Sequence, residues 1–288
     1  MKTDAAAALR VVWRGAGEYP FWLGRIHDPP AALWVRGRLL PDEGERSVAI
    51  VGARSATPLG ESFARLLARD LAAAGVTVVS GLARGIDAAA HQGALEAGGR
   101  TVAVLGSGVD RPYPRQNAEL AEAVARTGAL VSEFPPGSLA YKSNFPRRNR
   151  TIAGWSRVVV VVEAGERSGA LITARVALEE GREVMAVPGH PSVPAAAGTN
   201  ALLRDGAAVA RHARDVLDEL GLDPRPAPAP PGGRADPVLS LLARGVPASL
   251  EELAARASRP VPELLARLAE LELEGAIRRI PGALFVRS

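Results

Sequence analysis

The chain has 288 residues, which is enough for one large domain and a small second one. It contains no cysteine, so disulfide scaffolds, cysteine–zinc sites, iron–sulfur clusters and thiol nucleophiles are excluded. The formal net charge is +4, which is too small an excess to indicate nucleic-acid binding by itself. The sequence has no apolar run long enough to span a membrane, and its start is too charged for a signal peptide, so we expect a cytoplasmic protein.

A short N-terminal extension is expected over residues 1–40, and the main domain over residues 41–222. Short β-branched runs alternate with longer segments rich in alanine and leucine. The predicted strands are 33–36, 48–51, 76–80, 101–105, 129–132, 158–162, 183–187 and 207–210. The predicted helices are 59–74, 86–97, 116–126, 170–180 and 198–204. Most of the strands are continuous apolar runs, typical of parallel strands covered on both faces. The pattern therefore predicts an α/β fold with a Rossmann-like, doubly wound, mostly parallel sheet.

The segment 223–236 is rich in proline and glycine, which build neither a helix nor a ladder, so it is predicted to be a semi-rigid linker. Residues 237–288 then carry three stretches with helical apolar spacing, followed by a hairpin pattern at 277–287. The three stretches are 237–243, 250–257 and 261–273. Because this is the order of elements in a winged helix, a small C-terminal winged-helix domain is predicted.

Two glycine-containing loops follow predicted strands, where open α/β sheets bind their ligands. Glycine lets backbone N–H groups approach a phosphate, and a following helix adds a positive dipole. The candidate binding residues of these loops are Gly52, Arg54, Ser55, Ser80, Gly81, Arg84 and Gly85. The first loop, taken alone, slightly favours a tight turn with a solvated arginine. His91 is expected to be a packed or capping residue rather than a catalytic one, because no second histidine lies nearby.

A third loop, 141–150, carries four positive charges, no negative charge and an aromatic residue between the cations. Cations bind backbone phosphates and an exposed ring stacks on bases, which is typical of single-stranded nucleic-acid binding. The candidate residues are Lys142, Phe145, Arg147, Arg148, Asn149 and Arg150. Some of these arginines can instead cap helices or pair with Glu133 or Glu163. The charge of this loop equals the net charge of the whole chain, since the other parts balance.

A fourth loop contains Ser168 and Gly169, which form a predicted helix start able to accept a phosphate. Glu163 ends the strand before it, and can act as a general base or pair with an arginine of the third loop. A fifth turn, at 187–190, can line the same cleft. Several anion-binding loops along one sheet edge suit a polyanion better than a single small phosphate.

Seven motifs in family order resemble the DNA-processing protein A (DprA/Smf) family. They are VAIVGARSATPLG, VVSGLARGIDAAAH, VAVLGSGVDRPYP, LVSEFP, FPRRNRTIAG, VVVVEAGERSGALITA and VMAVPG. The resemblance implies a bacterial cytoplasmic protein, without enzymatic activity or a cofactor, that binds incoming single-stranded DNA. It also implies a homodimer that helps to load the RecA recombinase during natural transformation. In this family, strand binding falls on the positions that Arg54, Lys142 and Phe145 occupy in this sequence.

The sequence departs from the family pattern at both ends. Many members carry a helical SAM-like domain before the main domain, and only a short extension stands there, so the role of that domain is expected to be absent or reduced. From residue 236 onward, seven acidic residues balance seven arginines, and the expected third helix carries mainly glutamates. Since a DNA-reading helix should be basic, we predict protein contact or dimer support for this domain. The apolar pair Leu202 and Leu203 is a candidate dimer element.

Two other functions are consistent with parts of the sequence. A Rossmann-like nucleoside-monophosphate hydrolase would use Glu163 as its base, and Ser168 with Gly169 as its phosphate site. A pure interaction scaffold would neither bind oligonucleotides nor turn over nucleotides. A single nucleotide does not require the basic loop 141–150, and a scaffold does not either, so this loop favours single-strand binding.

Overall fold

The computed structural model describes residues 9–40, 44–222, 237–242, 248–257, 261–273, 276–280 and 284–287. The chain divides into two compact units, residues 1–227 and 228–288, each of which is described by itself. The segment 223–236, predicted to be the linker, lies outside the described residues. Within the described ranges, no helix is long and apolar enough to cross a membrane.

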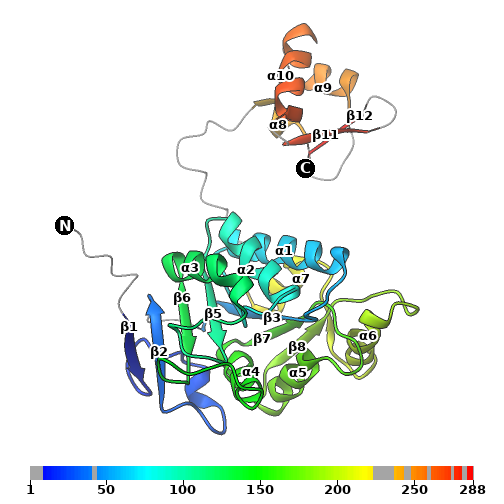
Figure 1. Cartoon of the computed structure of the whole chain (residues 1–288). Coiled ribbons are helices and arrows are strands. Elements are labelled where there is room, and N and C mark those ends of the chain that lie inside the picture. The colour runs from blue at the N-terminus through cyan, green and yellow to red at the C-terminus, as the bar shows by residue number, and fades with distance from the viewer. Residues whose placement is uncertain are drawn as a thin grey trace, which may run out of the picture. The chain divides into compact units, whose positions relative to one another are not determined.

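In the described part of the first unit, a nine-stranded sheet forms the framework (Figure 1). Its strands are β1 (Leu9–Trp13), β2 (Ala32–Gly37), β3 (Ser47–Val51), β4 (Thr77–Ser80), β5 (Thr101–Leu105), β6 (Ala129–Ser132), β7 (Val158–Val161), β8 (Glu183–Ala186) and β9 (Ala208–Val209). They lie in the order β1-β2-β6-β5-β4-β3-β7-β8-β9. Strands β3 to β9 run parallel to one another, whereas β2 pairs antiparallel with β6 and β1 antiparallel with β2. The predicted α/β fold with a mostly parallel, Rossmann-like sheet is confirmed.

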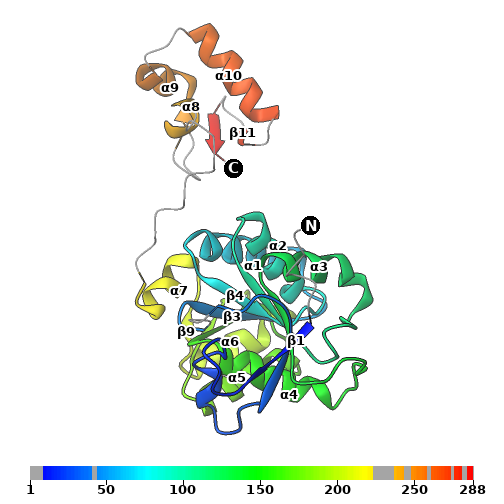
Figure 2. The same ribbon diagram turned by 90° about the vertical axis from the view of Figure 1, so that its left-hand side faces the viewer.

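Helices cover both faces of this sheet (Figures 1 and 2). They are α1 (Pro58–Ala73), α2 (Ile86–Glu96), α3 (Ala118–Thr127), α4 (Asn144–Trp155), α5 (Gly169–Glu179), α6 (Ala197–Arg204) and α7 (Ala213–Leu220). Short 3₁₀ turns occupy Leu23–Arg25, Arg115–Asn117 and Pro194–Ala196. Helices α1, α2, α3 and α7 lie on one face of the sheet and α4, α5 and α6 on the other, so the sheet is doubly wound as predicted.

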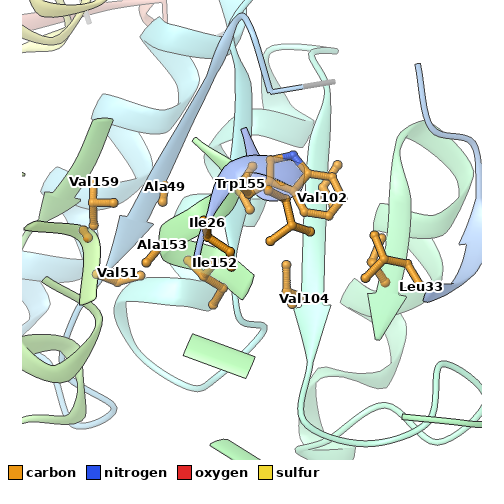
Figure 3. Close-up of a cluster of buried hydrophobic side chains, with 14 of the residues drawn as sticks. Ile26, Leu33, Ala49, Val51, Val102, Val104, Ile152, Ala153, Trp155 and Val159 are labelled. Atoms are coloured by element: carbon orange, nitrogen blue, oxygen red, sulfur yellow. The ribbon is translucent and has the colours of Figure 1, made fainter. Parts of the chain in front are cut away.

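The hydrophobic core lies in two layers, because successive side chains of each strand point to opposite faces. Along β3, Val48 and Ile50 pack with α1 and α2, while Ala49 and Val51 pack with α4. The second layer contains Trp155, which is fully buried at the end of α4 (Figure 3). A fully buried large apolar side chain contributes about 1.5–3 kcal/mol relative to an exposed one. The buried second half of α4 therefore fixes the position of its polar first half.

The strand order changes direction between β3 and β7. After β3 the chain adds β4, β5 and β6 on one side, and then returns to add β7, β8 and β9 on the other. The loops that follow β3 and β7 therefore leave the sheet in opposite directions. In open α/β sheets the crevice at such a switch point, beyond the carboxyl ends of the strands, is the usual place for a ligand.

The basic segment predicted as a loop is the first half of a helix, since α4 begins at Asn144. Pro146 lies in the first turn of α4, where a missing N–H group is tolerated. The residues that make the helix stable, from Thr151 to Trp155, are buried and lie after the basic run. The loop prediction for residues 144–150 was wrong. It rested on the charges and the proline and did not take into account the buried residues 151–155, which hold the helix.

Strand β1 and helix α7 were not predicted from the sequence. Strand β1 is an edge strand and pairs with β2, so residues 9–40 contribute to the main sheet. Helix α7 is short and amphipathic, and it buries Val216, Leu217 and Leu220. It ends at Gly221, which adopts the left-handed conformation that closes many helices.

Among the described residues of the second unit are three helices and a three-stranded antiparallel sheet. The elements are α8 (Pro237–Ser240), β10 (Ala248–Ser249), α9 (Leu250–Ala257), α10 (Val261–Leu273), β11 (Ile277–Ile280) and β12 (Leu284–Arg287). Leu253, Leu264, Leu268 and Phe285 form the centre of its core. The three predicted helices and the hairpin of β11 and β12 are present, as a winged helix requires.

Candidate functional site

Two loops pack directly against each other at the switch point, one after β3 and one after β4. A Cβ added to Gly52 would lie 2.5 Å from Cγ1 of Ile86. Gly85 has φ +71°, and a Cβ there would meet the carbonyl oxygen of Ala53. The N–H of Ile86 donates to that same oxygen over 3.2 Å. These glycines therefore let the start of α2 fix the backbone on which the exposed Arg54 stands.

Arg148 is the buried centre of the site. Helix α4 carries its side chain to the ends of β3 and β4, where only 5% of the side chain remains exposed. Its Nη1 lies 3.7 Å from Oδ2 of Asp87. A Cβ on Gly81 would coincide with that nitrogen. In the part of the chain that the structure describes, Nε and Nη1 of Arg148 are buried and have no hydrogen-bond partner.

The carboxylate of Asp87 is held by backbone groups. It accepts hydrogen bonds from the N–H groups of Gly81 (3.2 Å) and Ala83 (3.4 Å). Burial raises the pKa of Asp87 above its usual range, and the charge of Arg148 opposes this rise. Burial lowers the pKa of Arg148, Asp87 counteracts that shift, and Arg54 adds to it. An anion beside Arg148 would stabilise the charged guanidinium that burial destabilises.

His91 is fully buried and lies close enough to Arg148 to be affected by its charge. Its Nδ1 is 2.7 Å from Oγ1 of Thr101, whose hydroxyl donates to the carbonyl oxygen of Val78, so we assign the ring proton to Nδ1. Burial and the nearby charge of Arg148 lower the pKa of His91 to about 3. The imidazole is therefore neutral and packed, in line with the expected non-catalytic role.

Phe145 forms the aromatic part of the site. The guanidinium carbon of Arg54 lies 4.9 Å from the centroid of the Phe145 ring, and that of Arg148 lies 5.7 Å from it. The Tyr113 ring is tilted against it at 6.1 Å between centroids. These side chains line a small cavity of about 220 Å³. Lys142 is exposed just before α4, and its carbonyl oxygen accepts a hydrogen bond from the N–H of Phe145.

A larger cavity of about 890 Å³ also has Arg54 and Arg148 in its wall. It is lined by the loop after β3, the middle of α4 and the loop after β7 with the start of α5. Its polar and small lining residues include Gly52, Ser55, Asp87, Asn149, Gly165, Glu166, Arg167, Ser168, Gly169 and Thr173. Ser168 caps α5, since its Oγ accepts from the N–H of Ala170 over 3.3 Å. The cavity lies at the switch point of the sheet, beyond the ends of β3 and β7.

Two of the predicted cations lie against a carboxylate instead of a cavity. Arg147 and Arg150 both pair with Glu133, at 3.4 Å and 3.2 Å. Arg150 also pairs with Asp28, and Thr151 donates to Glu133. Neither arginine lines the two cavities. Within the basic segment, the structure therefore brings Arg148 and Phe145 to the cleft and ties Arg150 into the fold.

Ser80 and Glu163 are also engaged within the protein. Ser80 is fully buried, and its hydroxyl donates to the carbonyl oxygen of Ile50 over 2.6 Å, so it lies below the cleft. The carboxylate of Glu163 accepts hydrogen bonds from the N–H (3.0 Å) and the hydroxyl (2.8 Å) of Thr57 at the start of α1. Glu163 does not line either cavity. This geometry suits a helix cap better than the general base of a hydrolase.

Several residues that line the cleft were not among the candidates, and Tyr113, Arg167 and Thr173 are examples. Tyr113 is half exposed and supplies a second ring beside Phe145. It follows the weak Gly106-Ser107-Gly108 signal, in a motif whose aromatic residue could have indicated a stacking surface. Nearby, Leu82 holds a φ of +59°, a strained conformation that is often found at functional loops.

Both units of the chain match known protein families. Residues 10–221 match the family described as DNA recombination-mediator protein A. The chain belongs to this family. Residues 222–283 match the DprA winged helix domain, which confirms the predicted small domain as a winged helix.

Members of the family from several bacteria are similar to this chain. Protein Smf of Escherichia coli is 43% identical over 277 residues, which cover 92% of this chain and 74% of that protein. The DNA processing protein DprA of Bacillus subtilis is 43% identical over 203 residues, covering 70% and 68%. The Streptococcus pneumoniae DprA structure superposes with a TM-score of 0.69 at 37% identity and covers 75% of both chains. A role in DNA processing follows from membership of the DNA recombination-mediator family.

Proposed function

We propose that this chain is a non-enzymatic protein that binds single-stranded DNA across the two cavities at the switch point. The observation that carries the proposal is the stack of Arg54 on Phe145 beside the buried Arg148. A ring flanked by cations can hold one base face while the guanidinium groups hold phosphates. This chemistry is independent of base identity, so little sequence preference is expected.

The proposed binding residues are those of the four loops and of α4. They are Gly52, Arg54, Ser55, Ser80, Gly81, Arg84, Gly85, Lys142, Phe145, Arg147, Arg148, Asn149, Arg150, Ser168 and Gly169. Arg54, Arg148 and Phe145 are expected to contact the strand directly. Gly81 and Gly85 are expected to act through the backbone shape that they allow, and Ser80 through its position below the cleft.

A relative supports this proposal. The DNA processing protein A of Helicobacter pylori, whose structure concerns a single-stranded DNA binding mode, superposes with a TM-score of 0.67 at 27% identity. The match covers 76% of this chain and 98% of that protein. We further propose that this chain acts as a homodimer in the cytoplasm, protects incoming DNA and helps to load the RecA recombinase in natural transformation.

The binding proposal is tested with fluorescence anisotropy on an unstructured oligonucleotide, over a range of salt concentrations. Arg54→Ala and Lys142→Ala are each expected to weaken binding. Each is also expected to reduce the slope of log K against log salt concentration by about one. Phe145→Ala is expected to weaken binding by about 1–3 kcal/mol with the salt dependence unchanged. Arg175→Ala is the control, because that arginine is 71% exposed on α5 and lines neither cavity. Parental affinity in all three variants would refute the proposal.

A further inference from the structure

We propose that the bound strand continues out of the smaller cavity over the loops that follow β5 and β6, where Tyr141 stacks on a further base. These loops, residues 106–117 and 133–143, are called the platform. The inference rests on the proposed single-strand binding. It adds a base-stacking subsite outside both cavities, since Tyr141 lines neither of them.

The two loops of the platform are joined into one unit. Strands β5 and β6 are parallel neighbours, so both loops leave the same edge of the sheet. The N–H of Gly108 donates to the carbonyl oxygen of Ser138 over 3.0 Å. The N–H of Gly137 donates to the carboxylate of Asp110 over 2.9 Å. Loops that are held in this way lose little conformational freedom when a ligand binds, so their contacts contribute more fully to affinity.

The platform is continuous with the smaller cavity. Asn144 begins α4 and donates from Nδ2 to one carbonyl oxygen in each loop, that of Gly106 over 2.9 Å and that of Leu139 over 3.2 Å. Phe145 follows it, and the Tyr113 ring of the platform is tilted against the Phe145 ring at 6.1 Å. Both of these rings line the smaller cavity. A strand with a base on Phe145 therefore has the platform directly beside it.

Large apolar side chains are exposed on the platform. The chain has only five phenylalanines, three tyrosines and four tryptophans, and four of these rings lie between residues 113 and 145. The side chain of Tyr141 is 61% exposed, and that of Leu139 is 50% exposed. Among the described residues, the Tyr141 ring packs on no other aromatic ring. An exposed ring on a preorganised loop is what proteins use to stack on the bases of a single strand.

The charges of the platform suit a phosphate backbone. Three exposed cations lie on it: Arg111, Arg115 and Lys142. Its two carboxylates are engaged within the protein. That of Asp110 accepts from a backbone N–H group, and that of Glu133 is 3% exposed and paired with arginines of α4. Phosphates therefore meet cations on this surface, whereas an acidic group there has no exposed carboxylate without a partner to avoid.

Arg147 gains a role from this path. Its side chain is 60% exposed but lines neither cavity. Its guanidinium carbon lies 5.3 Å from the centroid of the Phe134 ring, which belongs to the platform. This cation–π contact holds the charge beside the platform, where a phosphate can reach it. A strand confined to the two cavities would not meet Arg147, whereas a strand that crosses the platform passes it.

The first test compares oligo(dT) of about 4 and about 12 nucleotides, because single-strand binding sites span about 4–16 nucleotides. The shorter oligonucleotide can occupy the cavities and leaves no nucleotides to cross the platform. Affinity is measured by fluorescence anisotropy for the parent, Tyr141→Ala and Tyr141→Phe. Leu178→Ala is the matched control, because Leu178 is 57% exposed on α5 and lines neither cavity.

We expect Tyr141→Ala to bind the longer oligonucleotide at least about fivefold more weakly than the parent, and the shorter one equally well. Tyr141→Phe keeps the ring and should match the parent at both lengths, as should Leu178→Ala. Parental affinity of Tyr141→Ala for the longer oligonucleotide, or an equal loss at both lengths, would overturn the inference. Failure of the parent to bind either oligonucleotide would instead contradict the proposed function.

The second test locates the strand directly. A single 5-iododeoxyuridine is placed at successive positions of the longer oligonucleotide, and the crosslinks that light induces are mapped by mass spectrometry. We expect a crosslink to Phe145 from one position and a crosslink to Tyr141 from another. Crosslinks to Phe145 with none to Tyr141 from any position would overturn the inference and leave the proposed function standing.

Discussion

Nη1 of Arg148 occupies the position that a Cβ on Gly81 would need. The guanidinium comes from α4 and the glycine from the loop after β4, so the two elements interlock at this point. The same glycine donates its N–H to Asp87, which pairs with Arg148. A single methyl group would therefore displace the arginine and its carboxylate together.

Gly81→Ala is expected to weaken oligonucleotide binding at least about tenfold and to lower the free energy of unfolding by about 1–3 kcal/mol, as overpacking does. Anisotropy and urea denaturation measure the two effects. Gly17→Ala is the matched control, because a Cβ there meets nothing within 4 Å. If Gly81→Ala binds DNA as tightly as Gly17→Ala does, the position of Arg148 is not needed for DNA binding.

Arg150 is expected to matter more for stability than for DNA. Its side chain is 19% exposed and pairs with Asp28 and with Glu133, whose side chain is 3% exposed. Arg150→Ala should lower the free energy of unfolding by about 1–3 kcal/mol, less than for a fully buried pair. Its loss of oligonucleotide affinity should be smaller than that of Arg54→Ala. The opposite order of affinities would make Arg150 a more important strand contact than Arg54 and would contradict this prediction.

Glu163→Gln is expected to destabilise the chain without revealing a catalytic role. The amide keeps one acceptor oxygen, but its NH2 group replaces the oxygen that accepts from the other Thr57 donor, and this loss costs about 1–2 kcal/mol at a helix start. Urea denaturation measures this loss, with the exposed Glu179→Gln as control. Release of free base from nucleoside monophosphates by the parent, abolished in Glu163→Gln, would support the hydrolase instead.

The buried His91 predicts a loss of stability as pH falls. Its pKa is lowered to about 3 in the folded chain from an ordinary value of 6.5, so the unfolded chain binds the proton first. Between these values stability falls with decreasing pH, by at most about 1.4 kcal/mol per pH unit for one group. The raised pKa of Asp87 acts in the opposite direction.

The substitution His91→Asn separates the effect of His91 on stability from that of Asp87. His91→Asn can keep a donor toward Thr101 and cannot take up a proton, so its free energy of unfolding should fall less steeply from pH 7 to pH 5 than that of the parent. Urea denaturation at several pH values gives both slopes. Parallel pH profiles of parent and variant would show that His91 does not carry the effect.

Much of the sheet could be predicted because its strands are buried on both faces. The runs at 48–51, 101–105 and 129–132 lie within one residue of β3, β5 and β6, since continuous β-branched runs have few alternatives there. Strand β1 has no continuous apolar run of this kind. It is an edge strand, and its exposed Trp13 is typical of a surface segment. Its place is decided by pairing with β2.

The candidate site could be predicted only in part. The loops were found from glycine and charge, but neighbours within the basic segment have different partners, because successive helix residues turn by about 100°. Arg148 points to the cleft, whereas Arg147 and Arg150 point to Glu133. When the segment is predicted as a loop, the directions in which its side chains point cannot be predicted. Leu202 shows the same limit, since it packs on the core of the sheet while its role in a dimer stays a prediction.

Glu163 joins the two sides of the switch point, since its carboxylate holds Thr57 and its carbonyl oxygen accepts the N–H of Ala53 over 2.7 Å. The loop that carries Arg54 is thus ordered by folding itself. The conformational entropy of that loop is lost before any strand arrives, so little remains to be lost on association. Differences in affinity among oligonucleotides should then appear mainly in their dissociation rates.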